Sequence, residues 1–268
     1  MKPTSCRPKI VVAADGRGVV GHAGARLVAD LADATGLSEA MSEALAPLRQ
    51  RDRGHDPGRV AVDLAVMLAD GGEAIADLAV LRNQSELFGP VASDPTAWRV
   101  LDGIDAAGLD RIRAARARAR ELAWAQAAET GRLPSSTVGG FAIPGFVLDI
   151  DATIVVCHSD KESAAKTWKK SFGYHPLLCF LDATGEALAG ILRPGNAGSN
   201  TAADHIRVLD LALAQIPDHL RHGEDILVRS DSAGASHAFL RYIRGLRERG
   251  VRTYFSVGVA MTEPIRTA

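Results

Sequence analysis

The fold is decided by the stretch Phe146-Val147-Leu148-Asp149-Ile150-Asp151-Ala152-Thr153-Ile154-Val155-Val156, an apolar, β-branched run that two aspartates interrupt. Such residues fit a buried, pleated surface, so the stretch predicts one central β-strand. Carboxylates inside a buried strand are costly to desolvate unless they are paired or bind a cation. Alternation along the strand predicts that Asp149, Asp151 and Thr153 share one face. We therefore expect the functional centre of the protein at this strand.

A second apolar run, Ile226 to Ser230, also ends in an aspartate, Asp231. The chain between the two runs predicts a hairpin of strands over 175–181 and 186–192, followed by a helix over 201–216. A further helix over 235–249 and a strand over 251–257 complete this order. A helical crossover lets the strand that ends at Asp231 run parallel to the first strand and lie beside it. Asp151 and Asp231 are then neighbours, and two carboxylates at one edge suit Mg²⁺ or Mn²⁺.

The N-terminal half has a helical pattern instead. Apolar residues recur at helical spacing over 25–48, where Gly36 separates two helices, and over 59–68, 73–81 and 110–128, and a helix start is predicted at 93–96. A short strand over 9–14 and a turn at Asp15-Gly16-Arg17-Gly18 precede them. The pattern predicts an all-α region over 1–131, a linker over 132–140 and a sheet-containing region over 141–268.

Charge and composition restrict the partners. The 268 residues carry a net charge of −1, so no field of the whole molecule attracts nucleic acid and any DNA contact must be local. The local candidates are Lys161, Lys166, Lys169, Lys170 and Arg193. Trp168 lies among these lysines and either stacks on a base or packs against the protein. Three scattered cysteines form no disulfide framework, which fits a reducing cytoplasm, and no apolar run reaches the length of a membrane span.

Several short stretches, in this order, resemble transposases of the DDE type, which are named for an Asp, Asp, Glu triad, and among them the bacterial insertion sequence family 1380. The matching stretches are Leu148-Asp149-Ile150-Asp151-Ala152-Thr153, Gly173-Tyr174-His175-Pro176-Leu177-Leu178, Leu192-Arg193-Pro194-Gly195-Asn196 and Val228-Arg229-Ser230-Asp231-Ser232, with weaker matches at His22-Ala23-Gly24, Leu87-Phe88-Gly89 and Asp94-Pro95-Thr96. The resemblance implies a ribonuclease H-like mixed sheet with flanking helices behind an all-α N-terminal region. It also implies metal-dependent DNA cleavage and strand transfer.

The resemblance also assigns roles to residues. Asp151, which has Thr153 two residues later, matches the first catalytic and metal-binding aspartate, and Asp231 matches the second. Asp149 and Thr153 are then supporting groups beside the ligands. The third ligand of the family is a glutamate in a later helix, so the sheet and the catalytic domain are expected to be incomplete at the C-terminus. Glu248 has the family's Arg-x-x-x-Glu spacing without its companion Tyr and Lys, and a solvated glutamate is the favoured interpretation.

The expected partners are the terminal inverted repeats of the element and its target DNA, bound by a homodimer in the bacterial cytoplasm. Two other functions fit part of the sequence. The spacing Asp149-x-Asp151-x-Thr153 also matches haloacid dehalogenase-like phosphatases, where the first aspartate is the nucleophile and the second the general acid and base. The long helical region ahead of this motif and the later stretches favour the transposase. The third possibility is a non-catalytic DNA-binding remnant.

Overall fold

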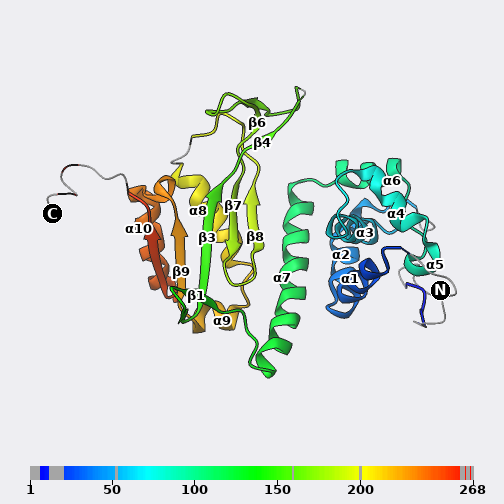
Figure 1. Ribbon diagram of the computed structural model, residues 1–268, viewed down its shortest axis with the longest axis horizontal. Coiled ribbons are helices and arrows are strands. Elements are labelled where there is room, and N and C mark those ends of the chain that lie inside the picture. The colour runs from blue at the N-terminus through cyan, green and yellow to red at the C-terminus, as the bar shows by residue number, and fades with distance from the viewer. Residues whose placement is uncertain are drawn as a thin grey trace. The chain divides into compact units, whose positions relative to one another are not determined.

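The computed structural model describes residues 7–11, 21–51, 54–158, 160–198, 201–259, 263 and 266. The chain divides into two compact units, Met1–Gln126 and Ala127–Ala268, and each is described here by itself (Figure 1). The boundary falls before the linker predicted over 132–140, and the predicted division at 131 and 141 stays a prediction. No helix among the described residues is both long and apolar enough to cross a membrane.

The regular structure described in the first unit is helical. Its α-helices are α1 (Ala23–Ala34), α2 (Leu37–Ala44), α3 (Pro57–Ala69), α4 (Ala79–Arg82), α5 (Ser85–Phe88), α6 (Asp94–Asp102) and most of α7 (Ala106–Glu129), with 3₁₀ turns at η1 (Ala46–Leu48) and η2 (Ile75–Leu78). The strand predicted over 9–14 is wrong for residues 9–11, because no other strand is described in this unit for it to pair with. Residues 12–14 and the predicted turn at Gly16 and Gly18 lie outside the described residues.

Helix α3 organises the core of this unit. Asp56 caps its N-terminus by accepting a hydrogen bond from the backbone N of Arg59 at 3.0 Å. The helix buries Val60, Leu64 and Met67 in a cluster with Phe88. Its buried Asp63 accepts hydrogen bonds from Arg59 at 2.8 Å and from Arg7 at 3.2 Å. Burial raises the pKa of Asp63, and the two guanidinium groups oppose that rise.

The second unit is built on a mixed five-stranded sheet of order β10-β9-β3-β7-β8 (Figure 1). The strands are β3 (Phe146–Ala152), β7 (Leu177–Leu181), β8 (Glu186–Ile191), β9 (Ile226–Ser230) and β10 (Thr253–Val257). Strand β3 is antiparallel to β7 and parallel to β9, with Ile150 opposite Ser230. The predicted hairpin and the predicted parallel neighbour of the first strand are thus confirmed.

Helices flank this sheet. Helix α8 (Ala202–Leu213) packs against β3, β7 and β8, and α10 (His237–Gly245) packs against β10 and α8. The short helix α9 (Asp218–Gly223) and the 3₁₀ turns η3 (Ser232–Gly234) and η4 (Leu246–Arg249) complete the connections. Buried aliphatic residues of β3 and β9, among them Leu148 and Val228, meet those of α8 in the core.

The predicted strand over 146–156 is wrong as one element. Strand β3 ends at Ala152, and β4 (Val155–Val156) pairs in a separate three-stranded sheet, β4-β6-β5, with β6 (Phe172–Tyr174) and β5 (Ala165–Lys166). The last β3–β7 pair is Ala152 with Leu177, and the preceding Pro176 has no N–H to extend the ladder. The backbone N of Thr153 donates to the carbonyl of Pro176 at 3.2 Å, so Thr153 leaves the strand that carries Asp149 and Asp151.

The stretch 132–140, predicted as a linker, contains a strand. Strand β1 (Ser136–Val138) pairs with β2 (Phe141–Ile143) as a hairpin. The two residues between them, Gly139 and Gly140, have φ values of 58° and 84°. Positive φ at both central residues is the requirement of a two-residue hairpin turn, so the glycines of this stretch make a turn.

Candidate active site

Asp151 and Asp231 line one cavity of about 550 Å³ in the second unit. Asp151 is the penultimate residue of β3, and Asp231 follows the last residue of β9. Because the two strands are parallel neighbours with Ile150 opposite Ser230, the next residue along each strand is the aspartate. The cavity is also lined by Trp168, His175, Asn196, His205 and Ser230. The predicted meeting of the two aspartates at one edge of the sheet therefore agrees with the geometry.

Both carboxylates are exposed and have local backbone partners. Asp151 Oδ1 accepts from the backbone N of Ala152 at 2.8 Å, and Asp231 Oδ1 accepts from that of Ala233 at 2.9 Å and so caps η3. The described residues include no group of three His, Cys, Asp or Glu side chains placed to hold a metal ion. Mg²⁺ is commonly held by one or two carboxylates together with substrate phosphates. The two aspartates fit a cation of that kind, shared with a phosphate group.

Asp149 has a different environment. Its Oδ1 and Oδ2 each lie 2.6 Å from Arg229, on Nε and Nη2 respectively, in a bidentate ion pair between β3 and β9. Nη2 of Arg229 also donates to Asp182, directly after β7. These hydrogen bonds, those to Asp149 first, raise the pKa of Arg229. Asp149 is absent from the cavity lining, and Thr153 lies outside β3, so neither supports Asp151 and Asp231 by a contact in the cavity.

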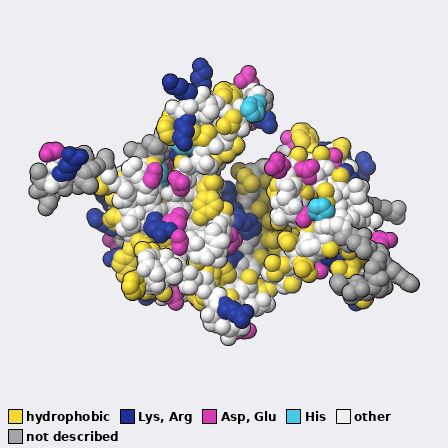
Figure 2. Space-filling view, viewed as in Figure 1, with side chains coloured by type: hydrophobic (Ala, Val, Ile, Leu, Met, Phe, Trp, Pro, Cys, Tyr) yellow, Lys and Arg dark blue, Asp and Glu magenta, His cyan; other side chains and the backbone are white. Residues whose placement is uncertain are grey.

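The four candidate lysines share the small sheet β4-β6-β5 and its loops. Lys161, Lys166, Lys169 and Lys170 are all exposed, and Figure 2 shows Lys and Arg side chains gathered where Figure 1 places β4 and β6. Trp168 is 70% exposed and lines the cavity, and the Nζ of Lys169 lies 5.1 Å from the centroid of its ring. The small sheet thus presents a basic surface at the border of the cavity.

Arg193 does not belong to that surface. It is 4% exposed, and its Nε donates to the carbonyl of His175 at 2.9 Å. Its Nη1 lies 3.2 Å from the carbonyl of Gly198 and 3.3 Å from Asp204. Arg193 therefore fixes the loop that carries Asn196 to the cavity wall, and it does not face a DNA phosphate. Glu248 lies exposed in η4 and does not line the cavity.

The chain also matches a known family. Residues 2–268 match the family described as transposase DDE domain group 1. The chain belongs to this family.

Solved transposases are similar to this DDE domain at low identity. A piggyBac transposase synaptic complex with hairpin DNA aligns with 90% of this chain and 53% of its own, at 12% identity and a TM-score of 0.43. The Mos1 transposase paired-end complex with the left transposon end aligns with 78% of this chain and 61% of its own, at 13% identity and a TM-score of 0.26. The chain thus spans between half and two thirds of those transposases. None of the curated proteins matches it.

Sequence reasoning about this DDE domain did not identify His205 and Ser230 as site residues. Both line the cavity, and His205 Nε2 and Ser230 Oγ are buried without a hydrogen-bond partner among the described residues. His205 is on the buried face of α8, beside Val208 and Leu209. A lone histidine on an apolar helix face has no metal-ligand spacing in the sequence, so only the fold shows that it faces the aspartates.

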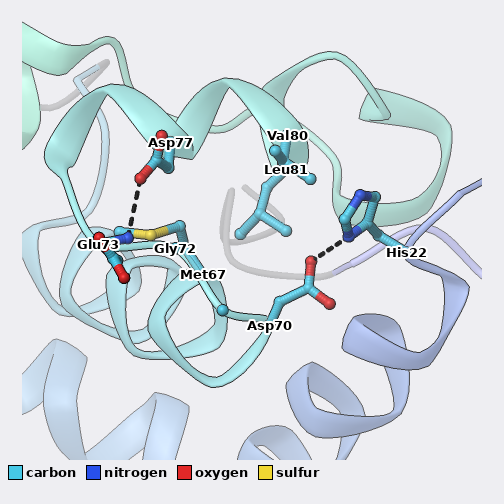
Figure 3. A pocket seen from close by; sticks show the side chains of 9 residues that line it. His22, Met67, Asp70, Gly72, Glu73, Asp77, Val80 and Leu81 are labelled. Carbon is cyan, nitrogen blue, oxygen red and sulfur yellow. Dashed lines mark hydrogen bonds and ion pairs between the residues drawn. The ribbon is translucent and has the colours of Figure 1, made fainter.

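The helical unit of this DDE domain has a second cavity, of about 380 Å³, between the end of α3 and η2 (Figure 3). His22 Nδ1 lies 2.6 Å from Asp70 Oδ2. Asp77 Oδ2 accepts from the backbone N of Glu73 at 2.9 Å and of Ala74 at 2.8 Å, and these bonds lower the pKa of Asp77. Each carboxylate is thus engaged in ordering its own turn, and we assign this cavity a structural role.

Proposed function

We propose that this chain carries the catalytic aspartates of a transposase of the insertion sequence family 1380, with a ribonuclease H-like sheet. The observation that carries the proposal is that Asp151 and Asp231 end adjacent parallel strands and line one cavity. Membership of the DDE family over residues 2–268 supports it. The sheet order, with the hairpin on one side of β3 and the parallel strands on the other, is the arrangement that the resemblance implies.

In this proposal Asp151 and Asp231 hold Mg²⁺ or Mn²⁺ jointly with a DNA phosphate. A divalent cation bound there supplies activation of the attacking oxygen and stabilisation of the leaving one. The chain's own residues orient the DNA, because the four lysines of the small sheet contact phosphates and the pair of aspartates sets where the scissile phosphate lies. The glutamate that the resemblance implies as third ligand is not among the described residues that line the cavity.

The DNA partners in the proposal are the terminal inverted repeats and the target DNA, bound by a homodimer in the bacterial cytoplasm. The basic surface at Lys161, Lys166, Lys169 and Lys170 supports binding to DNA, because it borders the cavity while the whole chain has a net charge of only −1. DNA contact through such a local surface depends on released counterions and weakens as salt rises.

The test is cleavage of DNA that carries the inverted repeats of the element, in Mg²⁺, by a protein that includes the third carboxylate. Asp151→Ala and Asp231→Ala are each expected to abolish cleavage and leave DNA binding largely intact. Asp149→Ala is expected to cost less activity, since Asp149 serves the ion pair with Arg229. Full cleavage by either Asp151→Ala or Asp231→Ala contradicts the proposal.

The same preparation tests the phosphatase alternative. A phosphatase nucleophile needs a free carboxylate, whereas both oxygens of Asp149 are held by Arg229. We therefore expect no metal-dependent hydrolysis of p-nitrophenyl phosphate. Turnover that is lost on Asp149→Asn establishes the phosphatase instead, and DNA binding without cleavage by the protein with its third carboxylate establishes the non-catalytic remnant.

A further inference from the structure

His205 occupies a defined place in the cavity wall. It is 1% exposed, and its ring packs against Phe239 with the two centroids 5.3 Å apart. Its Nδ1 lies 2.9 Å from the backbone carbonyl of Thr201, one helical turn earlier. A carbonyl oxygen can only accept, so Nδ1 carries the proton and donates it. In the neutral ring, Nε2 is then an acceptor.

This acceptor lacks a partner among the described residues, although it is buried. The same is true of Ser230 Oγ, directly before Asp231, and both residues line the cavity that holds Asp151 and Asp231. A buried polar atom left unpaired costs about 1–3 kcal/mol. Two such atoms in the wall of one cavity, beside two carboxylates, point to a polar ligand there.

The ligand is best matched by the hydration shell of a cation. No three His, Cys, Asp or Glu side chains among the described residues stand close enough together to hold an ion, so His205 lies outside direct coordination with both aspartates. Mg²⁺ dehydrates reluctantly and usually keeps several waters in a protein site. A ligand-orienting histidine typically donates its other ring N–H to a backbone carbonyl, as His205 does.

We propose that His205 is a positioning residue of the cation site, whose Nε2 accepts a hydrogen bond from a water in the hydration shell of the divalent cation at Asp151 and Asp231. The inference rests on the proposed function, because it needs a cation at those carboxylates. It adds to that function a neutral group from α8, which fixes where the hydrated side of the cation lies.

Mn²⁺ binding to the 268-residue chain, measured by the electron paramagnetic resonance signal of free Mn²⁺, tests this without any cleavage assay. His205→Phe keeps an aromatic ring against Phe239 and removes the acceptor, and it is expected to weaken Mn²⁺ binding about tenfold, the lower end for such supporting groups. His205→Gln retains an acceptor oxygen and is expected to recover most of the affinity. His219→Phe, at an exposed histidine of α9, is the matched control and should leave the affinity unchanged.

Electron spin-echo modulation of the bound Mn²⁺ gives an independent reading. A weak imidazole nitrogen coupling is expected, because a water separates Nε2 from the ion, and it should vanish in His205→Phe. His205→Gln serves the same reading if His205→Phe does not fold. A strong coupling means direct ligation and overturns the water-mediated contact, and the absence of any coupling overturns it as well.

The two aspartates separate failure of the inference from failure of the proposed function. If Asp151→Ala and Asp231→Ala remove Mn²⁺ binding while His205→Phe leaves it unchanged, the inference is wrong and the cation site stands. If the unaltered chain binds no Mn²⁺, or if neither aspartate variant alters binding, the proposed cation site is wrong and the inference fails with it.

Discussion

Two aspartates that stand two residues apart on β3 have different tasks because of what faces them on β9. Asp149 is opposite Arg229 in the strand register, and the two form a bidentate ion pair that Asp182 extends. Asp151 lies where the paired register with β9 has ended, and no ion pair with it is found among the described residues. Its carboxylate is therefore available to a cation, whereas that of Asp149 joins two strands.

We predict that Arg229→Met destabilises the second unit by about 1.5–3 kcal/mol, the range for hydrogen bonds to charged groups. The change leaves the carboxylates of Asp149 and Asp182 near each other without their shared cation. Urea denaturation measures the loss. Arg252→Met is the control, since Arg252 is 56% exposed in its pair with Asp225 and should cost less than about 1 kcal/mol. Equal losses in the two variants contradict the structural role of Arg229.

The position of β3 depends on the close approach of the chain at its start. Gly145 has φ +75°, and a Cβ there would lie 1.9 Å from the carbonyl oxygen of Asp225. That same carbonyl accepts a hydrogen bond from the backbone N of Phe146 at 2.8 Å, which aligns β3 with the chain entering β9. Only glycine allows this approach, because it combines a left-handed backbone with the absence of a side chain.

We predict that Gly145→Ala destabilises the protein clearly more than Gly185→Ala does. Gly185 has φ +67° with open space around it, so its substitution costs only the left-handed backbone, about 1–2 kcal/mol. Gly145→Ala adds the clash with Asp225, which the backbone must move to relieve. Free energies of unfolding from urea titrations compare the two, and a similar cost for both would show that the approach at Gly145 relaxes freely.

The small sheet is the element that we expect to bind the DNA backbone. Replacing Lys161, Lys166, Lys169 and Lys170 by Gln is predicted to flatten the dependence of log K on log salt by about 0.9 for each DNA phosphate that a lysine no longer neutralises. Duplex DNA of arbitrary sequence is a sufficient probe, measured by fluorescence anisotropy over a salt series. Replacing the exposed Arg207 of α8 and Arg241 of α10 by Gln is the control. An unchanged slope in the lysine variant places the DNA surface elsewhere.

At the scale of the whole molecule, the two units have separate hydrophobic cores. The buried cluster of the first unit includes Phe88, Val60 and Leu78. The second unit buries other side chains, including Leu148 and Val228. Each core is made of residues from its own unit, so a defect in one core should open that unit first.

We predict that Phe88→Ala, which costs about 3–5 kcal/mol for a buried phenylalanine, exposes the first unit selectively. Hydrogen exchange read by mass spectrometry should show reduced protection in α3 and retained protection in β3 and β9. Leu148→Ala is the reciprocal variant, with reduced protection expected in β3 and retention in α3. A uniform decrease of protection in either variant would mean that the two units unfold as one.

The sequence by itself determined the order of elements and the residues that end the two key strands. Local periodicity distinguishes a helical unit from a sheet, and the helical crossover between two apolar runs predicts that they are parallel, so Asp151 and Asp231 could be paired without a structure. The tertiary structure decided what periodicity does not encode. Pro176, on a neighbouring strand, ends the ladder of β3 and removes Thr153 from it. Arg193 is buried by a loop, and His205 faces the aspartates from α8. Each of these depends on contacts between residues distant in the chain, and a local pattern contains no information on which partner a side chain meets in space.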